Sequence, residues 1–100
     1  MPLKILRLPL AEDDLLDIWA SIALHSPRAA DRLVARFYEA EDKLAENPLI
    51  GEARPELGEG LRKWTVAAYL MFYAVEPDAL TIVRVLDGRR DLARVFDPWP

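Results

Sequence analysis

The segment "LRKWTVAAYLMFYAVEPDALTIVRVL", residues 61–86, decides the fold of this chain. Its apolar and β-branched residues fall into three runs, at 61–67, 69–75 and 80–86, and the middle run is apolar at nearly every position. The stretch "EPDA" between the second and third runs is typical of a turn. The pattern predicts three consecutive antiparallel strands, of which the middle one is covered at least in part on both faces.

Two helices are predicted upstream of these strands. From 11 to about 25 the apolar residues recur at helical spacing, and acidic residues occupy the first turn, where the helix dipole favours them. A second helix starts in "HSPRAAD", with Ser26 as the N-cap and the following proline at the first helical position, and it ends at Asn47, which precedes another proline. Its apolar stripe is interrupted by Glu41. The short break between the helices predicts an antiparallel hairpin.

The remaining segments complete a single α+β domain over residues 1–100. "LKILRL" at 3–8 alternates apolar and basic residues, which predicts an N-terminal strand, and 48–60 holds three of the four glycines and is expected to be a loop. Residues 89–96 are expected to form one helical turn or an extended tail. The order predicts a helical hairpin on one face of a small antiparallel sheet. One hairpin cannot cover both faces of a four-stranded sheet, so the second face is exposed or covered by something else.

Composition narrows the class of protein. The net charge is −4, and residues 1–60 carry seven basic and twelve acidic side chains, whereas residues 61–100 carry six and five. This balance argues against a general nucleic-acid binder, and the absence of cysteine excludes disulfides and thiolate zinc sites. No stretch approaches the roughly 20 apolar residues that cross a bilayer, and no signal peptide is evident. We expect a cytoplasmic domain without a membrane anchor.

Candidates for catalysis are few. The only histidine, His25, stands at the break between the two helices, where a structural role at a helix C-terminus is favoured. Asp13, Asp14 and Asp17 share one helix, and a solvated acidic face is the simplest interpretation. No residue set has the spacing of a metal site, and no base is positioned beside a serine. We therefore predict no catalytic residue, no metal and no cofactor.

The last strand carries an arginine among apolar residues. Simple alternation puts Val83 and Val85 on one face of the sheet and Arg84 on the other face with Ile82 and Leu86. An arginine in this position suits a paired or edge residue, and it equally suits an anion-binding residue.

The C-terminal tail combines charge with apolar side chains. After the glycine that ends the last strand, Arg89 and Arg90 precede Leu92, Val95 and Phe96. Arginine beside apolar anchors is typical of a protein-binding edge. The alternative is that the three apolar residues fold back on the sheet.

Taken in order, several short motifs resemble the ParE branch of the RelE/ParE toxin superfamily. They are "NPLIGEARPEL", "GLRKW", "YLMFYAVEPDALTIVRVL" and "GRRD", and the similarity extends over almost the whole chain. The resemblance implies the toxin half of a type II toxin–antitoxin pair, with the helical hairpin packed on the sheet.

The resemblance also implies two binding regions and their partners. A ParD-like antitoxin would dock on the hairpin at positions that the core does not use, among Leu15, Ile18, Trp19, Ile22, Leu33 and Phe37. The toxic face would lie at the last strand and the tail, with Arg84, Arg89, Arg90, Leu92, Val95 and Phe96. Its target is DNA gyrase in ParE-type toxins and ribosome-bound mRNA in RelE-type toxins. Neither a membrane nor a specific nucleic-acid sequence is an expected partner, whereas a toxin–antitoxin hetero-oligomer is.

Two departures from the RelE pattern favour gyrase. Many relatives carry a histidine where Asp87 stands, and the C-terminal tyrosine of many ribosomal members has no counterpart, since the tail offers Phe96 and Trp99. RNA cleavage needs a base at the 2′-hydroxyl and a group that stabilises charge. We therefore expect a non-enzymatic gyrase inhibitor. A ribosome-dependent endoribonuclease and an inactive homologue that only binds antitoxin remain open alternatives.

Overall fold

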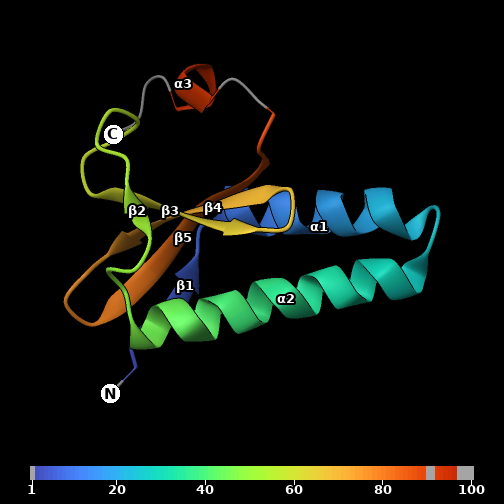
Figure 1. The fold of residues 1–100 in the computed structure, drawn as a ribbon, viewed down its shortest axis with the longest axis horizontal. Helices are drawn as coiled ribbons and strands as arrows, with labels where there is room; N and C mark the ends of the chain where they lie inside the picture. The colour runs from blue at the N-terminus through green and yellow to red at the C-terminus, as the bar shows by residue number, and fades with distance from the viewer. Residues whose placement is uncertain (1, 90–91, 97–100) are drawn as a thin grey trace.

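The computed structural model describes residues 2–89 and 92–96, which form five strands and three helices (Figure 1). The predicted α+β fold is confirmed, with the hairpin on one face of the sheet. In chain order the elements are β1 (Lys4–Arg7), α1 (Pro9–Ala23), α2 (Pro27–Glu46), β2 (Glu52–Ala53), β3 (Leu61–Val66), β4 (Tyr69–Val75), β5 (Ala79–Asp87) and α3 (Leu92–Val95).

The sheet has the order β1-β5-β4-β3-β2. Strands β3, β4 and β5 form the predicted antiparallel meander, and β2 adds a two-residue edge strand within the segment expected to be a loop. The departure from a purely antiparallel sheet is β1, which pairs in parallel with β5. A parallel neighbour requires a long crossover connection. Periodicity gives no information on such a non-local pairing.

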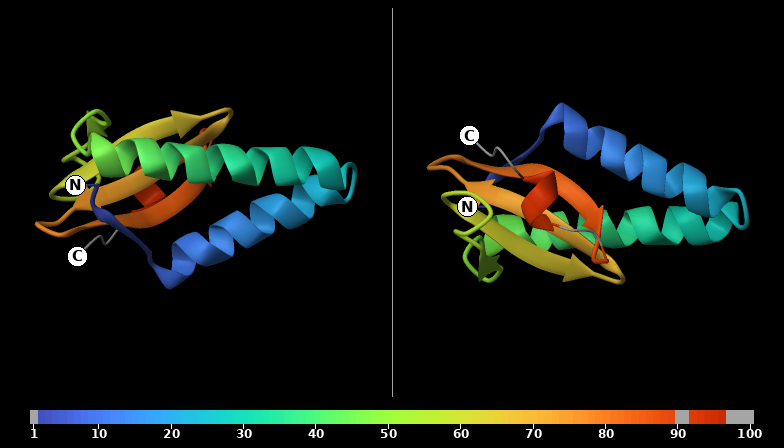
Figure 2. Two further views of the ribbon diagram at one scale, coloured as in Figure 1. Left: turned by 90° about the horizontal axis from the view of Figure 1, so that it is seen from below. Right: turned by 90° about the horizontal axis from the view of Figure 1, so that it is seen from above.

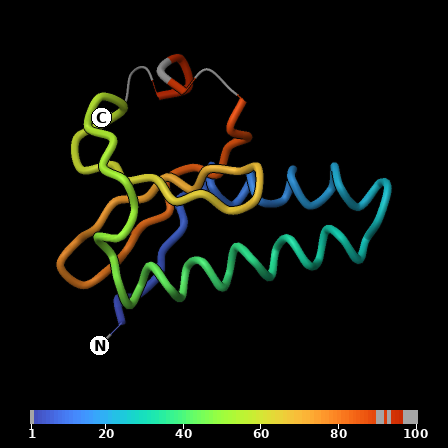
Figure 3. Tube along the Cα trace, viewed as in Figure 1, coloured from blue at the N-terminus to red at the C-terminus, as the bar shows by residue number. Residues whose placement is uncertain are grey.

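The helical hairpin covers one face of the sheet, and its tip extends past the ends of the strands (Figure 2). The second helix begins as predicted, because the Ser26 hydroxyl accepts a hydrogen bond from the Ala29 N–H at 3.1 Å. The chain starts beside the end of α2 (Figure 3), where the Leu3 N–H donates to the Ala45 carbonyl at 3.0 Å. Among the described residues, neither α1 nor any other helix has the length and apolar character needed to cross a membrane.

Between the hairpin and the sheet lies the larger apolar cluster. Its buried members are Ala11, Leu15, Phe37, Ala40, Leu44, Val66, Met71, Tyr73, Leu80, Ile82 and Val85. The interruption of the α2 stripe is explained here, because the Glu41 carboxylate is buried and accepts two hydrogen bonds from the guanidinium group of Arg7 on β1. The acidic residue therefore ties the second helix to the first strand.

The opposite face of the sheet is covered by the chain's own tail. Here the buried residues are Leu57, Leu61, Phe72, Val83, Leu86 and Phe96, with Leu92 and Val95 packed against them. The ring of Phe96 meets that of Phe72 edge to face, with the centroids 4.8 Å apart. Figure 2 shows α3 lying across the strands on this side. The question of what covers the second face is answered by residues 92–96.

A bulge in β5 changes the predicted faces of its residues. Phe72 lies opposite Arg84 and the next residue, Tyr73, lies opposite Ile82, so Val83 is an extra residue on β5. Val83 packs on the tail side and Val85 on the hairpin side. The expectation that these two valines share one face was wrong, and so was the expectation that Ile82 and Leu86 share the other, because simple alternation assumes an uninterrupted ladder.

The loop motif that begins with "NPLIG" is held against the sheet by two side chains. The Tyr73 hydroxyl donates to the Pro48 carbonyl at 2.8 Å and accepts from the Gly51 N–H at 3.0 Å. Arg62 donates to the carbonyls of Gly51 at 2.7 Å and Leu49 at 3.2 Å. A side chain at Gly51 would place its Cβ 2.3 Å from the Tyr73 hydroxyl, so this position requires glycine. The motif therefore has a structural role.

Replacing Tyr73 by phenylalanine is expected to change the stability of the fold and its dependence on pH. Burial raises the pKa of the Tyr73 phenol above its ordinary value of 10.0, because the phenolate would lose its hydration. The contribution of the neutral phenol is fully present below pH 10 and is lost as the pH rises through the folded-state pKa. Urea unfolding should show Tyr73→Phe to be less stable than the wild type at pH 7 by about 1–3 kcal/mol, with a shallower loss of stability above pH 10.

The control for this comparison is Tyr38→Phe, which removes an exposed phenol. An equal loss of stability above pH 10 in the wild type and in Tyr73→Phe would contradict the assignment.

Candidate protein-binding surfaces

The six hairpin positions assigned to antitoxin binding differ in exposure. Phe37 is fully buried and Leu15 is 8% exposed, so both belong to the core between hairpin and sheet. Ile18, Ile22 and Leu33 are half-buried. Trp19 is 37% exposed, and its indole N–H donates to the Asp31 carboxylate at 2.9 Å, which links α1 to α2. The side chains that remain within reach of a partner are therefore Ile18, Trp19, Ile22 and Leu33.

A groove runs between the two helices beside Trp19. It has a volume of about 250 Å³ and is lined by Glu12, Leu15, Leu16, Trp19, Val34 and Tyr38. Leu16 is 64% and Tyr38 48% exposed, which makes the groove an accessible apolar surface suited to a partner helix. The Arg7 guanidinium lies over the Tyr38 ring, 5.1 Å from its centroid. Sequence reasoning missed Leu16 and Tyr38, although their four-residue spacing from Glu12 and Val34 places them on this flank.

At the assigned toxic face, Arg84 is held by an acidic partner. Its guanidinium donates to both carboxylate oxygens of Asp14 on α1, at 2.7 and 2.9 Å. The same carboxylate accepts from the Val85 N–H at 2.9 Å, on the part of β5 that β1 does not reach. The hydrogen bonds from Arg84 to Asp14 raise the pKa of the guanidinium, although partial burial opposes this. Arg84 therefore joins the last strand to the first helix.

Arg89 is the exposed charge at the end of β5. Its side chain is 91% exposed, and its Nε and Nη2 donate to the Asp87 carboxylate at 3.1 and 2.9 Å. The backbone N–H of Arg89 donates to the same carboxylate at 2.9 Å, so Asp87 stabilises the turn that leaves the sheet. Arg90 and Trp99 lie outside the described residues.

The apolar residues of the assigned toxic face lie on the sheet. Phe96 is 5% exposed, and Leu92 and Val95 are half-buried against the tail-side cluster. In this arrangement a partner can reach the outer sides of Leu92 and Val95, whereas the Phe96 ring is covered.

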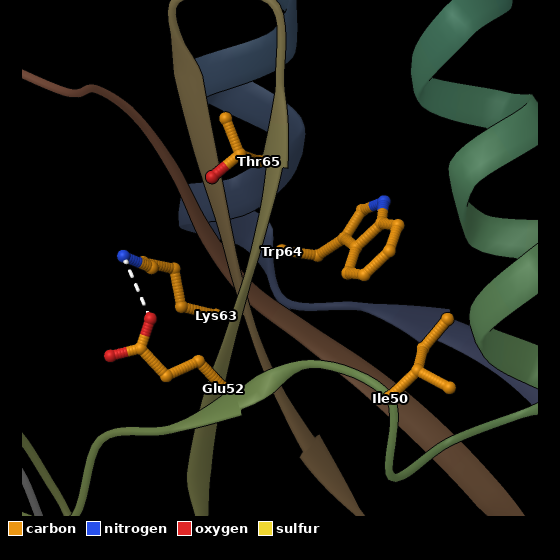
Figure 4. Close-up of a pocket in the computed structure, with 5 residues that line it drawn as sticks. All are labelled: Ile50, Glu52, Lys63, Trp64 and Thr65. Carbon is orange, nitrogen blue, oxygen red and sulfur yellow. Dashed lines mark ion pairs between the residues drawn. The ribbon is translucent and has the colours of Figure 1, made fainter.

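A shallow pocket at the outer edge of the sheet was not predicted (Figure 4). Ile50, Glu52, Lys63, Trp64 and Thr65 line it, and Lys63 pairs with Glu52 at 3.3 Å. Trp64 points toward α2, where the Lys43 ammonium lies 5.2 Å from the ring centroid. The two charged side chains of the pocket, Lys63 and Glu52, are paired with each other, which is typical of a structural edge. Within residues 2–89 and 92–96, no group of three or more His, Cys, Asp or Glu side chains is placed to hold a metal.

Comparison with known proteins agrees with this architecture. The family model for the ParE toxin of the type II toxin–antitoxin system parDE matches residues 5–92. Toxin ParE1 of Mycobacterium tuberculosis is 31% identical over 96 residues, which cover 94% of this chain and 98% of the relative. Toxin ParE3 of Caulobacter vibrioides is 30% identical over 66 residues, 66% of each chain.

A solved structure shares the fold. It is a chain of the chromosomal ParDE TA system from P. aeruginosa, which superposes with a TM-score of 0.72 at 22% identity and covers 85% of this chain and 95% of that chain. The family match takes in both helices of the hairpin and all five strands. The resemblance noted from the sequence motifs is thereby confirmed, and this chain belongs to the ParE toxin family of type II toxin–antitoxin systems.

Proposed function

We propose that this chain inhibits DNA gyrase by binding it in the cytoplasm, and that a ParD-like antitoxin neutralises the inhibition by forming a hetero-oligomer with it. The toxin itself acts without chemistry: it occupies a surface of its target through contacts at the end of β5 and at the tail. The antitoxin segment docks on the helical hairpin.

The antitoxin part of the proposal is supported by the accessible apolar surface of the hairpin. Leu16, Trp19 and Tyr38 together expose a contiguous groove that residues 2–89 and 92–96 leave unfilled. Apolar grooves between helices are typical docking sites for amphipathic helices. The structural neighbour carries the name of a ParDE system, which fits a ParD-like partner.

The proposal that gyrase is the target is supported by the pairing of charged side chains on the sheet with other groups of the chain. Arg84 is bound to Asp14, and Arg62 is bound to loop carbonyls. Asp87, at the position where many relatives have a histidine, accepts three hydrogen bonds from Arg89. Cleavage of RNA needs a base and a cation that are available to the nucleotide. Because Arg84, Arg62 and Asp87 are already paired, the site is less suited to RNA cleavage than to protein binding through the exposed side chain of Arg89.

Replacing Arg89 by alanine is expected to weaken inhibition of purified gyrase by about tenfold or more, because arginines are frequent hot spots of protein interfaces. The thermal midpoint should stay within a few degrees of the wild type, since the side chain is 91% exposed. The measurement is the toxin concentration that halves gyrase supercoiling.

Arg54→Ala is the control for the loss of one paired arginine, at a side chain that is 23% exposed. Arg54 also pairs with a carboxylate two residues away, that of Glu56, but lies in the loop that precedes β3. Two results would contradict the proposal: full gyrase inhibition by Arg89→Ala, or cleavage of mRNA on translating ribosomes by the wild-type protein.

A further inference from the structure

Helix α2 carries three exposed arginines four residues apart, Arg28, Arg32 and Arg36, here called the arginine row. Residues four apart on a helix are neighbours on its surface, so the three guanidinium groups follow one another along the same side. None of the three takes part in an ion pair or hydrogen bond with another described residue.

Other arginines of the described chain are engaged. Carboxylates or backbone carbonyls accept hydrogen bonds from Arg7, Arg54, Arg62, Arg84 and Arg89. Like charges four residues apart on a helix destabilise it slightly, by about as much as a pair of opposite charges would stabilise it. Acidic residues are plentiful in this chain of net charge −4, and Glu39 lines the same depression as Arg32 and Arg36, yet no described carboxylate forms an ion pair with the row. The row therefore does not contribute to the stability of the fold, and a ligand outside the chain explains it better.

The surface between the arginines is apolar and slightly hollowed. A shallow depression is lined by Ala29, Arg32, Leu33, Ala35, Arg36 and Glu39. Two of these residues are alanines, and Leu33 is half-buried. Small side chains allow the backbone of a partner to approach, and Leu33 offers an apolar contact at the centre of the depression.

We propose that the arginine row binds an acidic amphipathic segment of the antitoxin, with carboxylates spaced three or four residues apart and a small apolar residue placed on Leu33. This inference rests on the proposed pairing with an antitoxin. Arginine binds carboxylates through two parallel hydrogen bonds, which fixes the register of the segment.

Charge complementarity favours a protein over a nucleic acid. Four acidic residues of α2, Asp31, Glu39, Asp42 and Glu46, are exposed on the same helix. Phosphate backbones are bound by broad basic faces that neutralise several phosphates at once, and the row is too narrow for that. An acidic peptide pairs with the three guanidinium groups one by one, through carboxylates spaced three or four residues apart.

The row lies on a different flank of α2 from the groove beside Trp19. Arg32 and Arg36 are offset by two positions from Val34 and Tyr38, and the helix turns about 100° per residue, so the two sets face directions roughly 160° apart. One straight helix cannot contact both. The antitoxin must therefore wrap around α2, with one segment in the groove and a second, acidic segment on the row.

The test compares two triple variants of equal net charge. Arg28→Gln/Arg32→Gln/Arg36→Gln removes the row, and Lys4→Gln/Arg54→Gln/Lys63→Gln removes three positive charges elsewhere. The probe is the antitoxin encoded beside this chain's gene, titrated at low and at moderate salt. We expect the row variant to bind about 10- to 100-fold more weakly at low salt, with a smaller salt dependence, and the control variant to stay within about threefold.

Circular dichroism separates folding from binding. The row variant should melt at or above the wild-type temperature, since repulsion along the helix is relieved. A third variant with lysine at all three positions should recover only part of the affinity, because lysine restores the charge but not the paired hydrogen bonds. Equal affinity of the wild type and the row variant would overturn the inference and leave the proposed pairing intact.

Two further outcomes are decisive. Failure of the wild-type chain to bind this antitoxin at all would overturn both the proposed pairing and the inference. A 20-nucleotide RNA or a 20-base-pair DNA duplex serves as the second probe. If the wild type bound either one and the row variant lost that binding while keeping the antitoxin, the row would be a phosphate site and the inference would be wrong.

Discussion

Replacing Phe96 by alanine is expected to lower the free energy of unfolding by about 3–5 kcal/mol, the usual cost of emptying a buried aromatic site. The ring is 5% exposed and packs on Phe72, which is itself fully buried. A domain of this size has a total stability of roughly 5–15 kcal/mol, so the variant should be close to unfolding at 37 °C. Urea denaturation followed by circular dichroism measures the effect.

This prediction determines how experiments on the tail must be interpreted. Residues 92–96 cover the face of the sheet that the hairpin leaves open, so their deletion exposes Phe72, Val83 and Leu86. Loss of toxicity on truncation would then follow from unfolding, without any contact to the target. Arg89→Ala separates the two effects, because that side chain is exposed. If Phe96→Ala kept the wild-type stability and lost gyrase inhibition, the ring would leave the sheet to contact the target.

The parts of the fold that the sequence predicted are those set by local signals. The apolar runs of β3, β4 and β5, the cap at Ser26 and the proline after Asn47 each act within a few residues. The pairing of β1 in parallel with β5 and the return of the tail to the sheet depend on contacts between distant segments. No periodicity encodes them: the return of the tail remained one of two alternatives, and the parallel pairing was not predicted.

The bulge at Val83 shows the same limit within one strand. Alternation left open whether Arg84 is paired within the chain or binds an anion, and it could not identify Asp14, which lies 70 residues away in the chain. The extra residue on β5 changes which side chains face the hairpin, and the Asp14 carboxylate then binds both Arg84 and the Val85 N–H.

Binding residues are harder to predict than core residues because both give the same apolar pattern on a helix. The assigned antitoxin positions included Phe37 and Leu15, which the core uses, and omitted Leu16 and Tyr38, which are exposed. A stripe at helical spacing identifies the face that packs on the sheet. The flanks of that stripe, where a partner can reach, become visible only once the angle between the two helices is known.

The pairing of Arg7 with Glu41 predicts unequal effects for its two partners. Arg7→Met leaves the Glu41 carboxylate buried without a donor and is expected to lower the free energy of unfolding by about 3–5 kcal/mol. Glu41→Leu should be milder. The side chain of Arg7 is 25% exposed and lies 3.6 Å from Glu12. Without Glu41, its charge would therefore still be hydrated and paired with a second carboxylate. Urea midpoints of both variants at pH 7 measure the difference.

The double variant Arg7→Met/Glu41→Leu distinguishes a cost of burial from a loss of attraction. Two apolar residues in place of a buried pair are often neutral, so the double variant should recover most of the stability that Arg7→Met loses. A double variant as unstable as Arg7→Met would show that the attraction itself holds β1 to α2. Arg7 also lies over the ring of Tyr38 in the groove beside Trp19, so the same variants can be tested for antitoxin binding as well as for stability. A double variant that is stable but binds antitoxin more weakly would assign Arg7 a part in shaping the groove, in addition to neutralising Glu41.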